Sequence, residues 1–188
     1  MSELGLLGGA FDPPHNGHVA IARAALAQLP LERLLVLVVA DPGHKHTVLD
    51  AATRLELAHA AFPEYEVRLD EHAFTADSVR SGRFGDAYFV VGGDEAAAFG
   101  TWKEPEEVLR WVRLAVGTRS GFPPADLSRY GDRVVSFELE SPPISGTDVR
   151  ARIARGEPVD ELVPHAVARL IEEKGLYGAP SGAAHEHG

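Results

Sequence analysis

Gly8-Gly9-Ala10-Phe11-Asp12-Pro13-Pro14-His15-Asn16-Gly17-His18 is the stretch of this chain that decides its fold. It follows an apolar run, Leu4 to Leu7, that is typical of a buried strand, and it precedes an Ala/Ile/Leu pattern from Val19 to Leu29 that is typical of a helix. The stretch, called the corner (residues 8–18) below, therefore joins a strand end to a helix start. Its glycines allow close approach to the backbone, and the first N–H groups of the helix attract anions, so the corner is suited to a phosphate.

Two histidines, His15 and His18, lie three residues apart in the corner. The pair comes together if the helix begins near Asn16. Taken alone, an H-x-x-H pattern also fits half of a metal site or two surface histidines. The histidines by themselves therefore leave these alternatives open.

Composition bounds the architecture. With 188 residues and 45% apolar content, the chain is expected to form one compact α/β domain over residues 1–180. A domain of this size buries roughly two-thirds of its unfolded surface. Small and polar residues at the end predict a disordered tail over 181–188, in which His185 and His187 are solvated and are not site residues. The absence of cysteine excludes disulfides and thiol catalysis.

The lengths of the apolar runs and the first residues of the sequence together predict a cytoplasmic protein. No apolar run reaches the roughly 20 residues that a membrane span needs, and Met1-Ser2-Glu3 lacks the basic region of a signal peptide. We therefore expect neither an anchor nor a secretory leader.

The formal net charge is −10, from 28 acidic and 18 basic residues, and the sequence holds no basic stripe. Such a field repels nucleic acid, so we expect small-molecule partners. A phosphate site in this chain must gather its positive groups locally. The candidates are His15, His18, His44, Lys45, His46 and Arg150. The His44-Lys45-His46 run alone fits a solvated loop equally well.

Strand-like and helix-like patterns alternate along the rest of the chain. The expected strands are Arg33–Ala40, Tyr65–Leu69, Tyr88–Val91, Leu114–Val116 and a short one at Val134–Phe137; the expected helices are Ala51–Ala61, capped by Asp50, and Pro105–Trp111. This alternation predicts a Rossmann-like, doubly wound parallel sheet of five to six strands with flanking helices. Its ligand crevice should lie beyond the carboxyl ends of the strands, between the first and the fourth.

A second motif, Ile144-Ser145-Gly146-Thr147-Asp148-Val149-Arg150, precedes a predicted helix from Asp148 to Arg155 with Thr147 as its N-cap. The hydroxyls of Ser145 and Thr147 and the free amides around Gly146 suit an anion, and Arg150 can direct its guanidinium at a phosphate. A helix start with an arginine is also a common structural feature.

Together, the two motifs resemble the G-G-T-F-D-P-x-H-x-G-H and I-S-x-T-x-I-R segments of the nucleotidyltransferase superfamily. Ala10 stands where the superfamily has threonine or serine. The resemblance implies that the two histidines hold a triphosphate and the transition state. The ATP-binding residues that it implies are Gly8, Gly9, Ala10, Phe11, His15, His18, Gly92, Asp94, Ile144, Ser145, Thr147 and Arg150.

Four further segments resemble the nicotinate-nucleotide adenylyltransferases, so that the similarity runs from Leu4 to Tyr177. They are Phe74-Thr75-Ala76-Asp77, Gly92-Gly93-Asp94, Thr101-Trp102-Lys103 and the ending Glu173-Lys174-Gly175-Leu176-Tyr177. By this resemblance Trp102 stacks on a pyridine ring, Thr75 meets a nicotinate carboxylate and Asp94 binds a ribose. Lys45 and Lys103 complete the implied mononucleotide site. From the residues alone, Trp102 can instead be a packing residue and Asp94 a helix cap.

The reaction that the resemblance implies is attack by the 5′-phosphate of nicotinate mononucleotide on the α-phosphorus of ATP, with release of pyrophosphate. His15 and His18 would stabilise the α-phosphate and the leaving group, and Lys45 and Arg150 would hold the β- and γ-phosphates. Mg²⁺ would arrive with ATP, because the sequence has no obvious carboxylate cage for it. Gly43 replaces a proline common in the family, which loosens the loop that carries Lys45.

Two other functions remain open from the sequence. The first is a sister enzyme of the superfamily that uses nicotinamide mononucleotide or phosphopantetheine. The second is a sensor that binds adenine nucleotides without turnover. The sequence also leaves the oligomeric state open, a homo-oligomer included.

Overall fold

The computed structural model describes residues 4–82 and 84–179. Outside the described residues lies the predicted tail over 181–188, with His185 and His187. The first three residues, which carry the prediction that there is no leader, lie outside them too.

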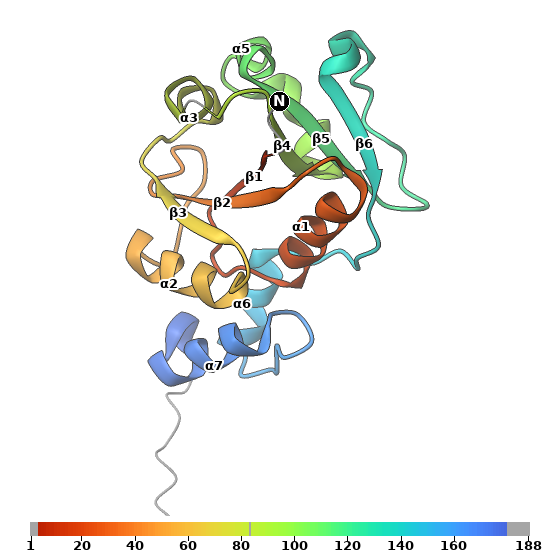
Figure 1. The fold of residues 1–188 in the computed structure, drawn as a ribbon. Coiled ribbons are helices and arrows are strands. Elements are labelled where there is room, and N and C mark those ends of the chain that lie inside the picture. The colour runs from red at the N-terminus through yellow and green to blue at the C-terminus, as the bar shows by residue number, and fades with distance from the viewer. Residues whose placement is uncertain (1–3, 83, 180–188) are drawn as a thin grey trace, which may run out of the picture.

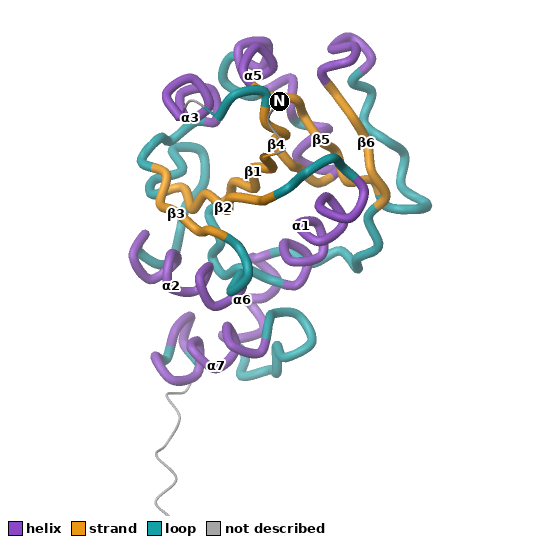
Figure 2. The backbone as a smooth tube through the Cα atoms, in the orientation of Figure 1, coloured by secondary structure: helices purple, strands orange, loops and turns teal. Residues whose placement is uncertain are grey.

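A six-stranded, all-parallel sheet forms the centre of the molecule (Figure 2). The strand order is β3-β2-β1-β4-β5-β6. The strands are β1 Leu4–Gly9, β2 Arg33–Val39, β3 Glu66–Asp70, β4 Ala87–Gly92, β5 Val112–Thr118 and β6 Val134–Glu138. The order reverses between β1 and β4, so the predicted doubly wound sheet and its switch point are confirmed.

Helices cover both faces of the sheet (Figure 1). One face carries α1 Asn16–Gln28, α2 Ala51–Ala61, α6 Gly146–Ala154 and α7 His165–Lys174; the other carries α3 Thr75–Gly82, α4 Gly93–Ala97 and α5 Pro105–Trp111. Alternate residues of β1, β2, β4 and β5 enter the two apolar clusters. In β1, for example, Leu7 packs with the first group of helices, and Leu4 and Leu6 pack with the second. Burial on both faces explains the continuous apolar runs of the sequence.

Several local predictions are confirmed, and one is wrong. Helix α1 begins at Asn16, Asp50 caps α2 by accepting from the Thr53 amide, and α5 has the expected bounds. Helix α6, however, begins at Gly146 with Ser145 as its N-cap, not Thr147. The Ser145 hydroxyl accepts from the Asp148 amide, because it lies three residues before that donor.

Candidate functional site

The corner and the second motif meet at the carboxyl edge of the sheet. Helix α1 has His15 as its N-cap and follows β1 after the loop of residues 10–14. Arg150, in α6, donates from Nη1 to the carbonyl oxygen of Asp12 at 2.7 Å, across 138 residues of sequence. A Cβ at Gly146 would lie 3.3 Å from the same oxygen, so the start of α6 approaches the corner closely. The two ends of the domain therefore form one site, as the sequence predicts.

His15 and His18 stack on one another with ring centroids 3.7 Å apart. The backbone N–H of His15 donates to Nδ1 of His18 at 3.1 Å. Because Nδ1 accepts this bond, the proton of a neutral His18 lies on Nε2. Phe11 contacts the His18 ring edge-on at 4.9 Å and is buried in the core, so its side chain supports the imidazole.

Burial keeps both imidazoles neutral near pH 7. It lowers the pKa of His15 to about 4, and the positive charge of Arg119 contributes. The pKa of His18 also lies well below its usual value because of burial, then His15 and Lys45. As neutral rings the pair can offer N–H donors but no positive charge, so the positive charge near them comes from Lys45 and Arg119.

Arg119 is a member of this group that the sequence analysis missed. It follows β5 directly, at the carboxyl edge of the sheet, and its charge acts on His15. Its Nε is buried and has no hydrogen-bond partner among the described residues. Its place three residues after the predicted strand Leu114–Val116, near the carboxyl edge of the sheet, was the signal that could have identified it.

The second motif is more internally bonded than predicted. The Ser145 hydroxyl donates to the Asp148 carboxylate at 2.7 Å, and Thr147 Oγ1 accepts from Arg150 Nη2 at 3.3 Å. A guanidinium has five N–H groups, and these bonds and the one to Asp12 use two nitrogens of Arg150. The guanidinium is thus fixed by these bonds, and its remaining N–H groups can still donate to a phosphate. Ile144 packs nearby, 3.9 Å from the position of a Cβ on Gly17.

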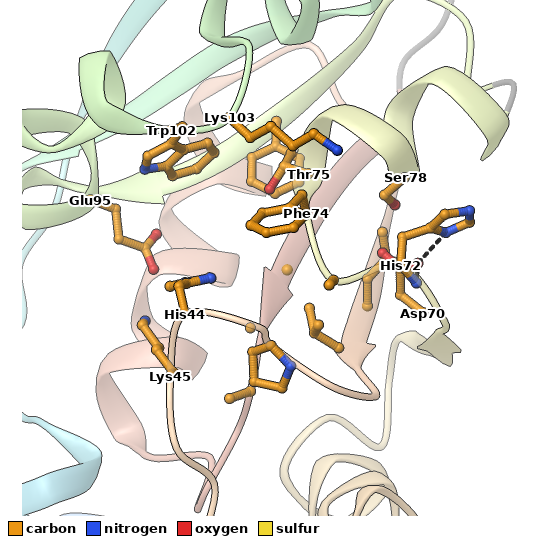
Figure 3. Close-up of a pocket in the computed structure, with 18 of the residues that line it drawn as sticks. His44, Lys45, Asp70, His72, Phe74, Thr75, Ser78, Glu95, Trp102 and Lys103 are labelled. Carbon is orange, nitrogen blue, oxygen red and sulfur yellow. Dashed lines mark hydrogen bonds and ion pairs between the residues drawn. The ribbon is translucent and has the colours of Figure 1, made fainter.

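Beside the corner lies a pocket of about 480 Å³ (Figure 3). It is lined by Gly8, Gly9, Ala10, Asp94, Lys45, Thr75, Trp102 and Lys103 from the predicted site, together with His44, Phe74, Phe89 and Glu95 among others. All four residues predicted for the mononucleotide therefore face one cavity. Asp94 lies in the first turn of α4, whose N-cap is Gly92, so the alternative that Asp94 caps this helix is wrong.

Trp102 forms one wall of the pocket. Its indole contacts Phe99 edge-on at 5.1 Å and Phe89 at 6.1 Å. These contacts fix the ring plane while the side chain remains partly exposed to the pocket. The residue is thus both packed and available to a ligand.

Lys103 does not present a free charge to the pocket. Its Nζ pairs with Asp77 at 2.9 Å and lies 4.9 Å from the centre of the Phe74 ring. Arg80 binds the same Asp77 and reaches Glu104 and Glu107 in or beside α5. This ion-pair network, called the wall network below, joins α3 to the segment that carries Trp102. The sequence could not show it, because the partners lie 26 residues apart.

Glu95 and Lys45 point toward one another across the mouth of the pocket (Figure 3). The surrounding protein raises the pKa of Glu95, whereas the charge of Lys45 opposes that rise. Lys45 also contributes to the lowered pKa of His18. Lys45 therefore lies between the corner and the pocket, although Gly43 precedes it in place of a proline.

The opposite side of the pocket is braced by a chain of hydrogen bonds. Nδ1 of His72 bonds the buried Asp70 at 2.8 Å, and its Nε2 bonds the Ser81 hydroxyl at 2.9 Å. This chain joins the end of β3 to the last turn of α3, the helix whose first residue, Thr75, lines the cavity.

Comparison with known proteins defines the class. The family model described as Cytidylyltransferase-like matches residues 6–152, so this chain belongs to that family of nucleotidyltransferases. A probable nicotinate-nucleotide adenylyltransferase of Exiguobacterium sibiricum is 36% identical, covering 93% of this chain and 98% of the relative. One of Chromobacterium violaceum is 34% identical, with 94% and 99% covered. The chain therefore belongs to the nicotinate-nucleotide adenylyltransferase family.

Solved structures share the fold. The Plasmodium falciparum nicotinic acid mononucleotide adenylyltransferase complexed with NaAD matches with a TM-score of 0.78 at 14% identity, covering 95% of this chain and 98% of that chain. Its complex with APC matches with a TM-score of 0.72 at 14% identity, with 93% and 96% covered. Within the described part of the chain, no helix is long and apolar enough to cross a bilayer.

Because folding lowers the pKa of His15, we expect the free energy of unfolding of the protein to depend on pH. The pKa of His15 falls from 6.5 to about 4 on folding, so between these values the unfolded chain binds a proton that the folded chain does not. The stabilisation is complete above pH 6.5 and is lost as the pH falls toward 4; a shift of this size corresponds to about 3 kcal/mol. Urea unfolding at pH 7, 6 and 5 measures it. His15→Asn should flatten the slope, and His165→Asn, at an exposed position, should not. Equal slopes in the wild type and His15→Asn would contradict this assignment.

Proposed function

We propose that this chain transfers the adenylyl group of ATP to nicotinate mononucleotide, giving nicotinate adenine dinucleotide and pyrophosphate. The observation that carries the proposal is the junction of the corner with Arg150, directly beside a pocket lined by Trp102 and Thr75. One half of the site suits a polyphosphate and the other suits an aromatic acid.

On the ATP side, Nε2–H of His18 donates to the α-phosphate as charge develops there, and His15 holds the ring in place. Lys45 and Arg150 hold the β- and γ-phosphates, with Arg119 adding positive charge behind His15. The backbone at Gly8, Gly9 and Gly92 and the start of α6 offer close approach. Fixed donors of this kind stabilise a transition state without reorganisation.

On the mononucleotide side, the indole of Trp102 stacks on the electron-poor pyridine ring. The Thr75 hydroxyl and the first amides of α3 donate to the nicotinate carboxylate. Asp94, on the ATP side, accepts from a ribose hydroxyl. Lys103 acts through the wall network, by fixing the segment that carries Trp102.

In the reaction, an oxygen of the 5′-phosphate attacks the α-phosphorus of ATP in line with the bond to the bridging oxygen. The new P–O bond forms as that bond breaks, and the electron pair leaves on pyrophosphate. No protein nucleophile is needed, so catalysis rests on alignment and on charge stabilisation.

Mg²⁺ accompanies ATP in this proposal and neutralises phosphate charge. Among residues 4–82 and 84–179, no three histidine or acidic side chains gather as a metal site. Magnesium commonly keeps phosphate oxygens and water as most of its ligands. We further propose that residues 1–180 act as one nucleotidyltransferase domain in the cytoplasm, with small molecules and not nucleic acid as partners.

One assay tests the reaction class and the substrate together. Purified protein is incubated with ATP, Mg²⁺ and either nicotinate or nicotinamide mononucleotide, and pyrophosphate release is measured. We expect a higher kcat/KM with the acid, because Thr75 and the helix amides offer donors to a carboxylate. Preference for the amide would assign the sister activity. ATP binding without pyrophosphate release from either mononucleotide would indicate a sensor.

A further inference from the structure

Asp12 joins four parts of the chain. Neither of the hydrogen bonds of its carboxylate goes to a residue of the predicted site. Asp12 is buried, with 7% of its surface exposed. Its Oδ1 accepts from the Tyr177 hydroxyl and its Oδ2 from the Val48 amide, both at 2.5 Å. Its carbonyl oxygen accepts from Arg150. The corner, the loop that carries Lys45, α6 and the end of the chain therefore meet at one aspartate.

Arg54 holds the backbone of the same region by hydrogen bonds from its guanidinium. It is 1% exposed and donates to four carbonyl oxygens at 2.7 to 3.0 Å. These oxygens belong to Ala10, Val39, Ala40 and Leu49. The positive charge of Arg54 and the negative charge of Asp12 attract one another in this buried setting. The backbone on both sides of the Lys45 loop is thus held to a rigid base.

Tyr177 bonds Asp12 from the other end of the chain, 165 residues away. It follows α7 and lies at φ 57°, a left-handed conformation that non-glycine residues rarely adopt. Burial and the contact with Asp12 raise its pKa, so the hydroxyl stays protonated and donates. The side chain also packs against the core, so packing and the bond to Asp12 together hold this unfavourable backbone in place.

We propose that Tyr177 is a positioning residue for ATP, whose hydroxyl fixes Asp12 and thereby holds Lys45 and Arg150 in register with the corner histidines. The proposal rests on the ATP site assigned under the proposed function. His18 is oriented by a separate bond from the His15 backbone, and Trp102 by its own aromatic contacts. Loss of the Tyr177 hydroxyl should therefore act on the grip of the triphosphate and spare the mononucleotide pocket.

The test is Tyr177→Phe, which deletes a single hydroxyl and keeps the ring. Hydrogen bonds to buried charged groups are among the stronger ones, so we expect the KM for ATP to rise about fivefold to tenfold, with the KM for nicotinate mononucleotide within about twofold of wild type. Calorimetric binding of a non-hydrolysable ATP analogue should weaken to the same extent. Because this readout needs no turnover, it tests the positioning role even if the wild type released no pyrophosphate.

Two further variants sharpen the result. Tyr65→Phe removes a hydroxyl from another tyrosine packed on the same core and should leave both KM values unchanged. Asp12→Asn should weaken analogue binding by itself, and adding Tyr177→Phe should then cost less than it does in the wild type, since the two share one bond. A lowered melting temperature with unchanged ATP binding would overturn the proposal, as would equal losses for both substrates or additive effects of the two changes.

Discussion

His18→Ala should lower kcat by about 10² to 10⁴, with only a modest loss of ATP affinity. The expected size is that of removing a donor that acts mainly in the transition state. The structure supplies the reason, because the bond from the His15 backbone leaves Nε2–H as the free donor and burial keeps the ring neutral. Rapid-quench measurement of product formation at saturating substrates gives the chemical step directly.

A matched control separates this effect from loss of folding. His165→Ala changes an exposed histidine at the start of α7 and should leave kcat unchanged. Thermal unfolding of His18→Ala should be followed in parallel, because the ring packs on His15 and Phe11. A folded His18→Ala enzyme with wild-type kcat would remove His18 from the mechanism.

Trp102→Ala is the second change with a large expected effect, and it should act on the other substrate. Stacking of an aromatic side chain on a base is worth about 1–3 kcal/mol, so the KM for nicotinate mononucleotide should rise roughly 5- to 150-fold. The KM for ATP should change little, because Trp102 lines a pocket whose lining does not include His15, His18 or Arg150. Steady-state kinetics with each substrate varied in turn measures both.

Phe122→Ala is the control for loss of a large aromatic ring. Phe122 is 58% exposed and is not among the residues that line the pocket, so both KM values should stay unchanged. Trp102→Phe should recover part of the affinity, since a smaller ring still stacks. If Trp102→Ala raised the KM for ATP alone, the indole would belong to the adenine side of the site.

The sheet was predictable because its signals are local. Apolar runs alternate with helix patterns, and Pro105 and Asp50 mark helix starts by their own chemistry. The ends of the strands were harder to predict. Strand β1 extends past Leu7 to Gly9, because its backbone continues to pair with β2 through Val38. Helices α3 and α7 were not among the predicted elements.

The candidate site was predictable as a set of residues but not as a set of bonds. The motifs identified Lys103, yet its partner Asp77 lies on another element and depends on the fold. Ser145 and Thr147 both carry hydroxyls, and only the geometry of the helix start selects Ser145 as the cap. The neutral state of the histidines follows from burial, which spacing does not reveal. Arg54 and Arg119 have no motif of their own.

The wall network is more open to dissolved ions than the contacts that hold the corner. Four of its five members, Lys103, Asp77, Arg80 and Glu104, are 31–49% exposed, and the fifth, Glu107, is 20% exposed, so mobile counter-ions reach them readily. Asp12 and Arg54, by contrast, are shielded from solvent. Rising ionic strength should therefore loosen the segment that carries Trp102 before it loosens the base of the corner.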